Sequence, residues 1–368
     1  MSKEIVLVQE EYAKAGVDIS AGNSFTSMIK TLVESAWPNT GQEIGGFAGG
    51  GPIPPCATMV KGSTDGTGTV AILSAIIDRF NFIGQNAVGM SVVDLYVSGS
   101  RPLYVLDTLS VAKLRPRKHI GIIKDIIHAC KISGCRLIGG ETAELPDMFP
   151  FSWMFNLDTA VIGFPEAKLA FVPIRLGQKV YGWLSFGPGS NGYSLLRRAH
   201  DLRLEQTFSD FAKQMFGLGS NVSRVMKNLT KPRLELDGAC LADIMLVPVP
   251  IYINNMDKER DRGVKFAGHA HITGGGLVEN IPRILPHNMK VVIDRSLWER
   301  PRIFSYTQDV GKIGDAEMDR VFNNGIMVVS IVDQNGPLPD DSAVIEIGTV
   351  ESRVENEPQV QLVNQYRD

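Results

Sequence analysis

K-G-S-T-D-G-T-G-T, residues Lys61 to Thr69, lies between a short β-rich run and the apolar stretch V-A-I-L-S-A-I-I. Gly66 and Gly68 let backbone N–H groups approach an anion, and a helix starting after Thr69 would add donors and a favourable dipole. Asp65 would repel a phosphate, so a divalent cation, usually Mg²⁺, would have to lie between them. The same residues are also typical of a tight turn. The stretch therefore predicts a strand-to-helix junction that is either a phosphate and Mg²⁺ site or a plain turn.

A second acid lies in a stretch with helical periodicity, residues 82–97. Ile83, Ala87, Met90, Asp94 and Val97 recur at helical spacing, which places Asp94 on the stripe that should face the core. A carboxylate there needs a cation, a metal ion or hydrogen-bond donors. Asp94 is therefore either a satisfied structural acid or a ligand of the same metal ion as Asp65.

A third polar group follows a short apolar strand in L-I-G-G-E-T-A-E-L-P-D, residues 137–147. Gly139 and Gly140 are predicted to end the strand, which places Glu141 and Thr142 at its carboxyl end, where α/β proteins form their sites. A plain strand exit would look the same. Three acid-bearing segments in one half of the chain nevertheless favour a shared site.

The order of apolar runs predicts two lobes of mixed α/β class. Short β-rich runs (A-T-M-V, L-Y-V-L-D-T-L-S-V, C-R-L-I and D-T-A-V-I-G-F) alternate with helical stretches between Ala57 and Phe164. Two prolines then interrupt the pattern between Pro165 and Pro173, and a new strand, K-V-Y-G-W-L-S-F, follows. With 368 residues the chain exceeds the usual single domain. We place the lobes at residues 1–168 and 169–368.

Two glycine turns stand out in the second lobe. G-P-G-S-N-G-Y-S-L, residues 187–195, opens a predicted helix; Ser190 suits its N-cap, and Asn191 can donate and accept hydrogen bonds. H-I-T-G-G-G, residues 271–276, is a strand-to-helix turn in which His271 could carry a proton or donate to a phosphate. A plain helix cap and a structural histidine are the alternative interpretations.

Composition excludes several classes of function. The formal net charge is −3, so the chain has no basic surplus for a nucleic acid or an anionic membrane. No apolar run reaches membrane-spanning length, and the N-terminus lacks the apolar core of a secretory signal. The four cysteines show neither zinc-site nor redox-pair spacing. We expect a cytoplasmic protein with reduced thiols.

Taken in order, these segments resemble the aminoimidazole ribonucleotide synthetase family, the phosphoribosylformylglycinamidine cyclo-ligases of purine biosynthesis. The resemblance covers nearly the whole chain. It is carried by Y-A-K-A-G-V-D-I-S-A-G-N (Tyr12 to Asn23), G-G-F (Gly45 to Phe47), T-D-G-T-G-T, L-I-G-G-E-T-A-E-L-P, S-N-G-Y-S-L, H-I-T-G-G-G-L-V-E-N-I-P-R-I-L-P (His271 to Pro286), F-N-N-G (Phe322 to Gly325) and I-G-T-V (Ile347 to Val350).

The resemblance implies a two-lobed fold and a homodimer whose N-terminal lobes build a β-barrel-like interface, with the ATP site in a cleft between lobes. It implies ATP and Mg²⁺ as cofactors and a ribonucleotide as the substrate. The γ-phosphoryl group of ATP would pass to the formyl amide oxygen of formylglycinamidine ribonucleotide. An amidine nitrogen would then displace the phosphate and close the ring of aminoimidazole ribonucleotide.

The resemblance also implies roles for particular residues. The expected metal ligands are Asp65, Asp94 and Glu141, and the expected catalytic residues are Asp94, Asn191 and His271. The expected ATP-binding residues are Lys14, Gly45, Gly46, Asp65, Gly66, Gly68, Thr69, Gly139, Gly140, Glu141 and Thr142.

The sequence departs from the family pattern inside these motifs. Val70 stands where members usually have Lys, Val93 where they have Asn, and Gly189 where they have His. The early Tyr-Lys pair is shifted, so that Lys14 lies one place late. Three hypotheses follow: an active cyclo-ligase with a rearranged site, a diverged paralogue acting on another amide, and a catalytically silent nucleotide-binding homologue.

Overall fold

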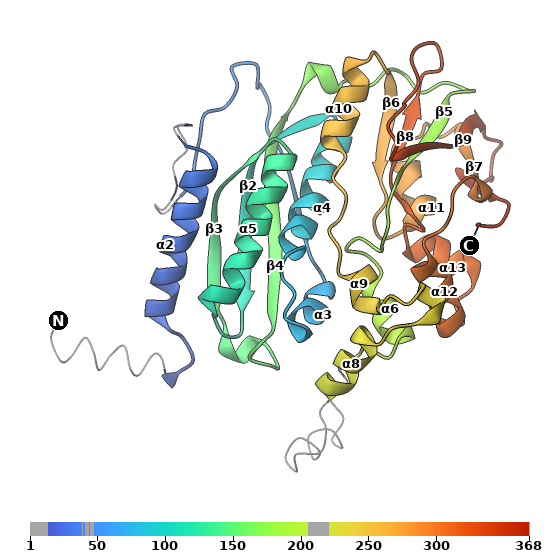
Figure 1. Cartoon of the computed structure of the whole chain (residues 1–368). Coiled ribbons are helices and arrows are strands. Elements are labelled where there is room, and N and C mark those ends of the chain that lie inside the picture. The colour runs from blue at the N-terminus through green and yellow to red at the C-terminus, as the bar shows by residue number, and fades with distance from the viewer. Residues whose placement is uncertain (1–13, 39, 41–43, 45–47, 205–220, 368) are drawn as a thin grey trace. The chain divides into compact units, whose positions relative to one another are not determined.

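The computed structural model describes residues 14–38, 40, 44, 48–204 and 221–367 (Figure 1). The expected ATP-binding residues Gly45 and Gly46 lie outside the described residues. The chain divides into two compact units, Met1–Leu169 and Ala170–Asp368. Each unit combines helices with one β-sheet, which confirms the predicted mixed α/β class.

The first unit contains an open four-stranded sheet with the strand order β1-β4-β2-β3. β4 pairs antiparallel with both β1 and β2, whereas β2 and β3 run parallel. β1 and β3 are therefore the edge strands. The strands are β1 (Lys61–Gly66), β2 (Ser100–Val111), β3 (Arg136–Glu144) and β4 (Phe155–Pro165).

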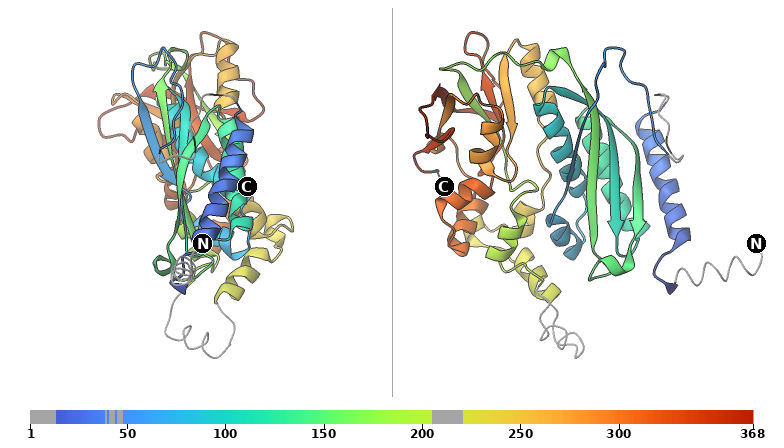
Figure 2. Two further views of the ribbon diagram at one scale, coloured as in Figure 1. Left: turned by 90° about the vertical axis from the view of Figure 1, so that its left-hand side faces the viewer. Right: turned by 180° about the vertical axis from the view of Figure 1, so that it is seen from behind.

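Helices pack against one face of this sheet, and seen from behind the strands lie in front of them (Figures 1 and 2). α4 packs against β1, β4 and β2 and against the neighbouring helix α5, so most of its sides are buried and most of its residues are apolar. Ile83, Ala87 and Met90 are buried as predicted, while Asp94 and Val97 are half-buried. The unit's helices are α2 (Ile19–Ala36), α3 (Val70–Ile76), α4 (Ile83–Val97), α5 (Pro116–Ile132), and the short 3-10 helices η1 (Pro146–Met148) and η2 (Ala167–Leu169).

Two predicted strand boundaries in this unit are wrong. The apolar run A-T-M-V, residues 57–60, is not a strand; the polar segment that follows it forms β1. An edge strand pairs on one side only and can be polar. β3 does not end at Gly139 and Gly140 but continues to Glu144, because β2 pairs with it along this length, with a bulge beside Leu106. Glu141 therefore lies inside a strand.

The second unit contains a six-stranded sheet with the order β10-β7-β9-β5-β8-β6. β8 lies between β5 and β6 and runs antiparallel to both, and its residues are buried along its whole length. The strands are β5 (Lys179–Leu184), β6 (Phe266–His271), β7 (Met289–Asp294), β8 (Ile326–Val332), β9 (Val344–Ser352) and β10 (Val360–Val363).

The helix predicted after Ser190 is α6 (Tyr193–Ala199), but its N-cap is Gly192, with a φ of 73°. The predicted Ser190 cap is therefore wrong. A left-handed backbone conformation at the N-cap position favours glycine. The other helices of this unit are α8 (Asn221–Thr230), α9 (Leu241–Met245), α10 (Ile253–Asp261), α11 (Gly276–Asn280), α12 (Arg302–Gly311) and α13 (Asp315–Val321), with 3-10 turns η3 (Leu234–Leu236), η4 (Ile281–Arg283) and η5 (Arg295–Leu297). Among the described helices of the whole chain, none is both long and apolar enough to cross a membrane.

Candidate active site

Two neighbouring rows of paired residues cross the first sheet. The first row is Asp65, Thr159, Asp107 and Gly140, and the second is Gly66, Asp158, Thr108 and Glu141. Side chains alternate along a strand, so the two rows point to opposite faces. Thr159 shows the direction of the first row, because its Oγ1 donates to the carbonyl of Ala87 on α4 over 2.9 Å. The first row therefore faces the helices, and the second lies on what we call the open face.

Asp65 and Asp94 lie on the helix side of the sheet. Ser91 of α4 bonds Thr159, the pairing partner of Asp65, over 2.8 Å. Asp94 follows Ser91 by three residues and so lies on the same side of α4, about 4.5 Å further along its axis. Both acids are half-buried, and one Asp65 oxygen accepts from the Gly66 N–H over 2.7 Å. Both predicted acids therefore lie on the helix side of this sheet, with Asp94 offset along α4 toward the Lys61 end of β1.

Glu141 lies elsewhere, on the open face and on the opposite edge strand. Three strand spacings separate β1 from β3, which is about 14 Å between backbones. Glu141 and Asp65 also point to opposite faces, so their carboxylates do not meet. In the part of the chain that the structure describes, no three His, Cys, Asp or Glu side chains form a ready metal site. A shared metal ion therefore stays a prediction that requires ligand phosphates as additional oxygen donors.

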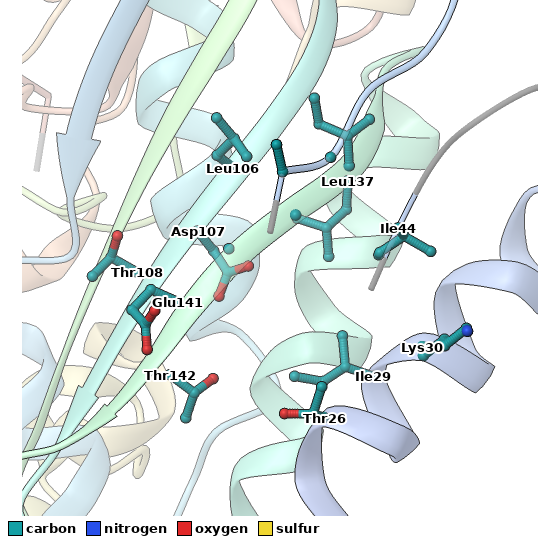
Figure 3. A pocket seen from close by; sticks show the side chains of 15 residues that line it. Thr26, Ile29, Lys30, Ile44, Leu106, Asp107, Thr108, Leu137, Glu141 and Thr142 are labelled. Atoms are coloured by element: carbon teal, nitrogen blue, oxygen red, sulfur yellow. The ribbon is translucent and has the colours of Figure 1, made fainter. Parts of the chain in front are cut away.

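A pocket of about 480 Å³ opens along the edge strand β3, between β3 and α2 (Figure 3). Its size is typical of small-molecule sites, and its walls combine apolar side chains with glycine backbone. The pocket contains the whole predicted segment Gly139 to Thr142, whereas Asp65, Gly66, Gly68 and Thr69 are not among its described lining residues. The lining residues are Thr26, Ile29, Lys30, Ile44, Ala48, Gly49, Leu106, Asp107, Thr108, Leu137, Ile138, Gly139, Gly140, Glu141 and Thr142.

Asp107 is a pocket residue that the sequence interpretation missed. It is 7% exposed, and a Cβ on Gly140 would lie 2.2 Å from its Oδ1, so Gly140 leaves the space that the carboxyl group fills. Burial raises its pKa to about 7, and the charge of Glu141 adds to this rise against an opposing backbone hydrogen bond. A charged residue inside the apolar run L-Y-V-L-D-T-L-S-V was the available signal, since burying such a group without a function is costly.

Replacing Asp107 with Asn should stabilise the chain much more at pH 8 than at pH 5. The folded-state pKa lies above the ordinary aspartate pKa of 3.8, so folding favours the protonated carboxyl and the free energy of unfolding falls as pH rises from about 4 to 7. Asn cannot ionise, so Asp107→Asn should gain on the order of 2 to 4 kcal/mol above that window. Urea unfolding at both pH values measures the difference. The exposed Asp147→Asn serves as the control, and an equal effect of Asp107→Asn at both pH values would contradict the assignment.

The remaining predicted residues of the first unit that the structure describes lie outside the pocket lining. Lys14 is exposed and begins the described chain. Gly68 has a φ of 60°, and Thr69 is the N-cap of α3 without a side-chain cap bond. Val70 and Val93, which replace polar residues of the family pattern, are 0% and 3% exposed. These two substitutions are therefore accommodated as core packing.

Three turns meet at one end of the sheet in the second unit. β5 and β6 end where β8 begins, because β8 runs antiparallel to both. This end carries the turns 185–192, 272–276 and 322–325. The first of these turns includes Asn191, and the second directly follows His271. His271 ends β6 opposite Val328 and is 5% exposed, and Asn191 is half-buried. The structure therefore gathers the glycine motifs of this unit into one cluster of backbone turns.

Comparison with known proteins identifies both units. The model of the AIR synthase related protein N-terminal domain matches residues 57–163, and that of the C-terminal domain matches residues 177–353. The chain is 39% identical over 330 residues to the phosphoribosylformylglycinamidine cyclo-ligase of Geotalea daltonii, covering 87% of each chain. It is 34% identical over 371 residues to the enzyme of that name from Cupriavidus metallidurans, covering 96% of each.

Solved structures share the fold at low identity. Hydrogenase maturation protein HypE in complex with ATP has a TM-score of 0.57 at 16% identity, over 91% of this chain and 90% of that one. Thiamine-monophosphate kinase from Stenotrophomonas maltophilia has a TM-score of 0.54 at 12% identity, over 91% and 95%. The fold, the two domain matches and the nearly full-length identity lead to one conclusion: the chain belongs to the AIR synthase family, with the phosphoribosylformylglycinamidine cyclo-ligases.

Proposed function

We propose that this chain is an ATP-dependent cyclo-ligase that converts formylglycinamidine ribonucleotide to aminoimidazole ribonucleotide. The observation that carries the proposal is the match to curated cyclo-ligases at 34% identity across 96% of the chain. ATP phosphorylates the formyl amide oxygen, the amidine nitrogen attacks the activated carbon, and phosphate leaves as the ring closes. ADP and phosphate are the by-products.

The pocket beside β3 is our candidate for part of the ATP site. Gly139 exposes backbone without a side chain, which suits a close approach by phosphate oxygens, whereas Gly140 makes room for Asp107. Ile29, Ile44 and Leu137 supply apolar wall on which a planar base can pack. Thr26 and Thr142 offer hydroxyl donors and acceptors to the ribose.

We propose Mg²⁺ as the companion of the nucleotide. Its preferred donors are oxygens, and it is usually held by one or two carboxylates together with substrate phosphates. Asp65 and Asp94, on the helix side of the first sheet, are our candidates for such a partial ligand set, and Glu141, whose carboxylate does not meet that of Asp65, provides a separate carboxylate at the pocket. When bound, Mg²⁺ would offset the charge that develops on the transferred phosphoryl group.

We assign Asn191 and His271 to the ribonucleotide substrate. Both lie at the end of the second sheet that carries the three turns, where glycines leave backbone N–H groups accessible to anions. Asn191 can donate to the amide oxygen that is phosphorylated, and His271 can carry a proton during ring closure. Lys14, Gly45, Gly46, Gly66, Gly68 and Thr69 stay proposed contacts of the nucleotide.

A homodimer built through the open face of the first sheet is a further part of the proposal. Leu106, Ala160 and Ile162 lie on this face, where they are apolar and only half-buried. Two such faces packed together would bury this apolar surface and create a barrel-like interface. We propose a cytoplasmic location, where ATP is supplied and the described cysteines stay as free thiols.

Purified protein supplied with ATP, Mg²⁺ and formylglycinamidine ribonucleotide should release ADP and phosphate and form the imidazole product. Omitting the ribonucleotide or chelating the metal ion gives the matched blanks. Light scattering on the same preparation should report twice the chain mass of 40.2 kDa.

The outcomes separate the three hypotheses of function. Turnover above the blanks supports the cyclo-ligase. ATP binding by calorimetry without turnover of the ribonucleotide would replace it with a silent nucleotide-binding protein. Phosphate release with a different formamide or amide substrate, but not with this ribonucleotide, would point to a paralogue.

A further inference from the structure

The turn F-N-N-G, Phe322 to Gly325, has no role in the proposal above, yet it contacts both glycine turns at the end of the second sheet. Phe322 packs so closely against Gly192 that a Cβ there would lie 2.4 Å from its ring. A Cβ on Gly276 would lie 3.1 Å from its carbonyl oxygen. Both positions have left-handed backbone, with φ of 73° and 58°. The turn therefore fixes how closely the other two approach.

Asn323 connects this turn to the turn that carries Asn191. Its Nδ2 donates to the carbonyl of Gly187 over 3.1 Å and to Oγ of Ser185 over 3.4 Å. Its Oδ1 accepts from the N–H of Gly325 over 2.9 Å. One side chain, 3% exposed, thus satisfies backbone groups of two turns at once.

Ser185 completes the connection. Its N–H donates to the carbonyl of Gly325 over 2.7 Å, and its Oγ donates to the carbonyl of Gly187 over 2.8 Å. Ser185 and Asn323 are both buried, so these bonds lie where water does not compete with them. Between this network and Asn191 lie Pro188, Gly189 and Ser190. Gly189 has a φ of 69°, and a Cβ there would lie 3.9 Å from Asn323 Nδ2.

We propose that Asn323 is a positioning residue that holds the Gly187–Asn191 turn in the geometry needed for the ribonucleotide. The inference rests on the proposed function for the identity of the substrate, and on the hydrogen bonds for the role. Asn323 acts through the turn, so its effect should fall on the reaction of the ribonucleotide, while the ATP pocket in the first unit is unaffected. A misplacement of about 1 Å at a reacting group can reduce a rate by about 100-fold.

Asn323→Asp and Ser185→Ala test the role by different chemistry. Asn323→Asp keeps the acceptor for Gly325 and removes the donors to Gly187 and Ser185. Ser185→Ala removes one hydroxyl and leaves Asn323 intact. We expect kcat/KM for the ribonucleotide to fall about 10- to 100-fold in Asn323→Asp and less in Ser185→Ala, with the KM for ATP unchanged. Asn335→Asp, an exposed asparagine beyond the other end of β8, is the matched control.

Amide hydrogen exchange across residues 185–192 gives a readout that needs no turnover. Faster exchange in this turn in both variants, with unchanged exchange in β5 and β8, supports the role. Wild-type kinetics together with wild-type exchange in Asn323→Asp would overturn it, as would an equal loss of ATP affinity. If Asn323→Asp does not fold, Ser185→Ala decides by the same two measurements. If the wild-type protein itself shows no turnover, the proposed function fails while the exchange result still decides the positioning role.

Discussion

Replacing Glu141 with Gln lowers kcat/KM for the cyclo-ligase reaction by at least about 100-fold, the expected loss when a preorganised electrostatic group is removed from a phosphoryl-transfer site. Glu141 is exposed on an edge strand and lines the pocket with Gly140 and Thr142. Gln has the same shape and keeps the hydrogen-bonding capacity of the strand, so the change removes charge and leaves the fold. A coupled assay of ADP release measures the effect, and the Mg²⁺ concentration for half-maximal activity should rise.

Asp147→Asn is the matched control for Glu141→Gln. Asp147 is an exposed acid in η1, shortly after β3, and it does not line the pocket. It should keep wild-type kinetics, and both variants should unfold at the wild-type temperature. If Glu141→Gln kept more than about a tenth of the wild-type kcat/KM, the role of Glu141 toward the metal ion and the nucleotide would be misassigned.

Replacing Gly276 with Ala should destabilise the second unit by about 3 kcal/mol or more, whereas Gly274→Ala in the same turn should be nearly neutral. Gly276 has a φ of 58°, and its Cβ would lie 1.9 Å from the carbonyl oxygen of Asp319. Gly274 has no atom within 4 Å of an added Cβ. The left-handed backbone and the overlap both act against Gly276→Ala, so the chain must shift α13 or the turn.

Urea unfolding followed by tryptophan fluorescence distinguishes the two variants, since Trp183 and Trp298 are buried in this unit. We expect the midpoint of Gly276→Ala to fall by about 1 M or more and that of Gly274→Ala to stay within about 0.2 M of wild type. If the urea midpoints of the two alanine variants fell by the same amount, the contact between this turn and α13 would not constrain the fold. Because the turn follows His271, Gly276→Ala should also reduce activity at temperatures where it remains folded.

Local sequence patterns predicted much of the fold. The spacing of the apolar residues predicted the positions of α3, α4, β2, β4, β5 and β6 to within a few residues. Local spacing can do this because it depends on which face of a helix or strand is buried. The errors arose where tertiary pairing overrode local signals. Two glycines did not end β3, because β2 continues to supply hydrogen-bond partners beyond them. The polar Lys61–Gly66 segment became a strand because β4 pairs with it.

The candidate site was predicted less completely than the fold. Spacing identified Gly139 to Thr142, and these residues do line one pocket. It did not show that Asp65 and Glu141 point to opposite faces of the sheet, since that depends on the alternation within strands whose pairing was not known. Asp107 was missed for the same reason, because its contact with Gly140 exists only across the β2 and β3 pairing.

The sequence by itself determined the family, the mixed α/β class and the glycine and acidic motifs, because each of these features depends on residues that are close together along the chain. Only the tertiary structure decided which acids share a face of the sheet, which glycine makes room for Asp107, and how Asn323 joins two turns. These are contacts between distant segments, and strand register and burial set them. A change of one residue in that register would move every side chain of a strand to the opposite face.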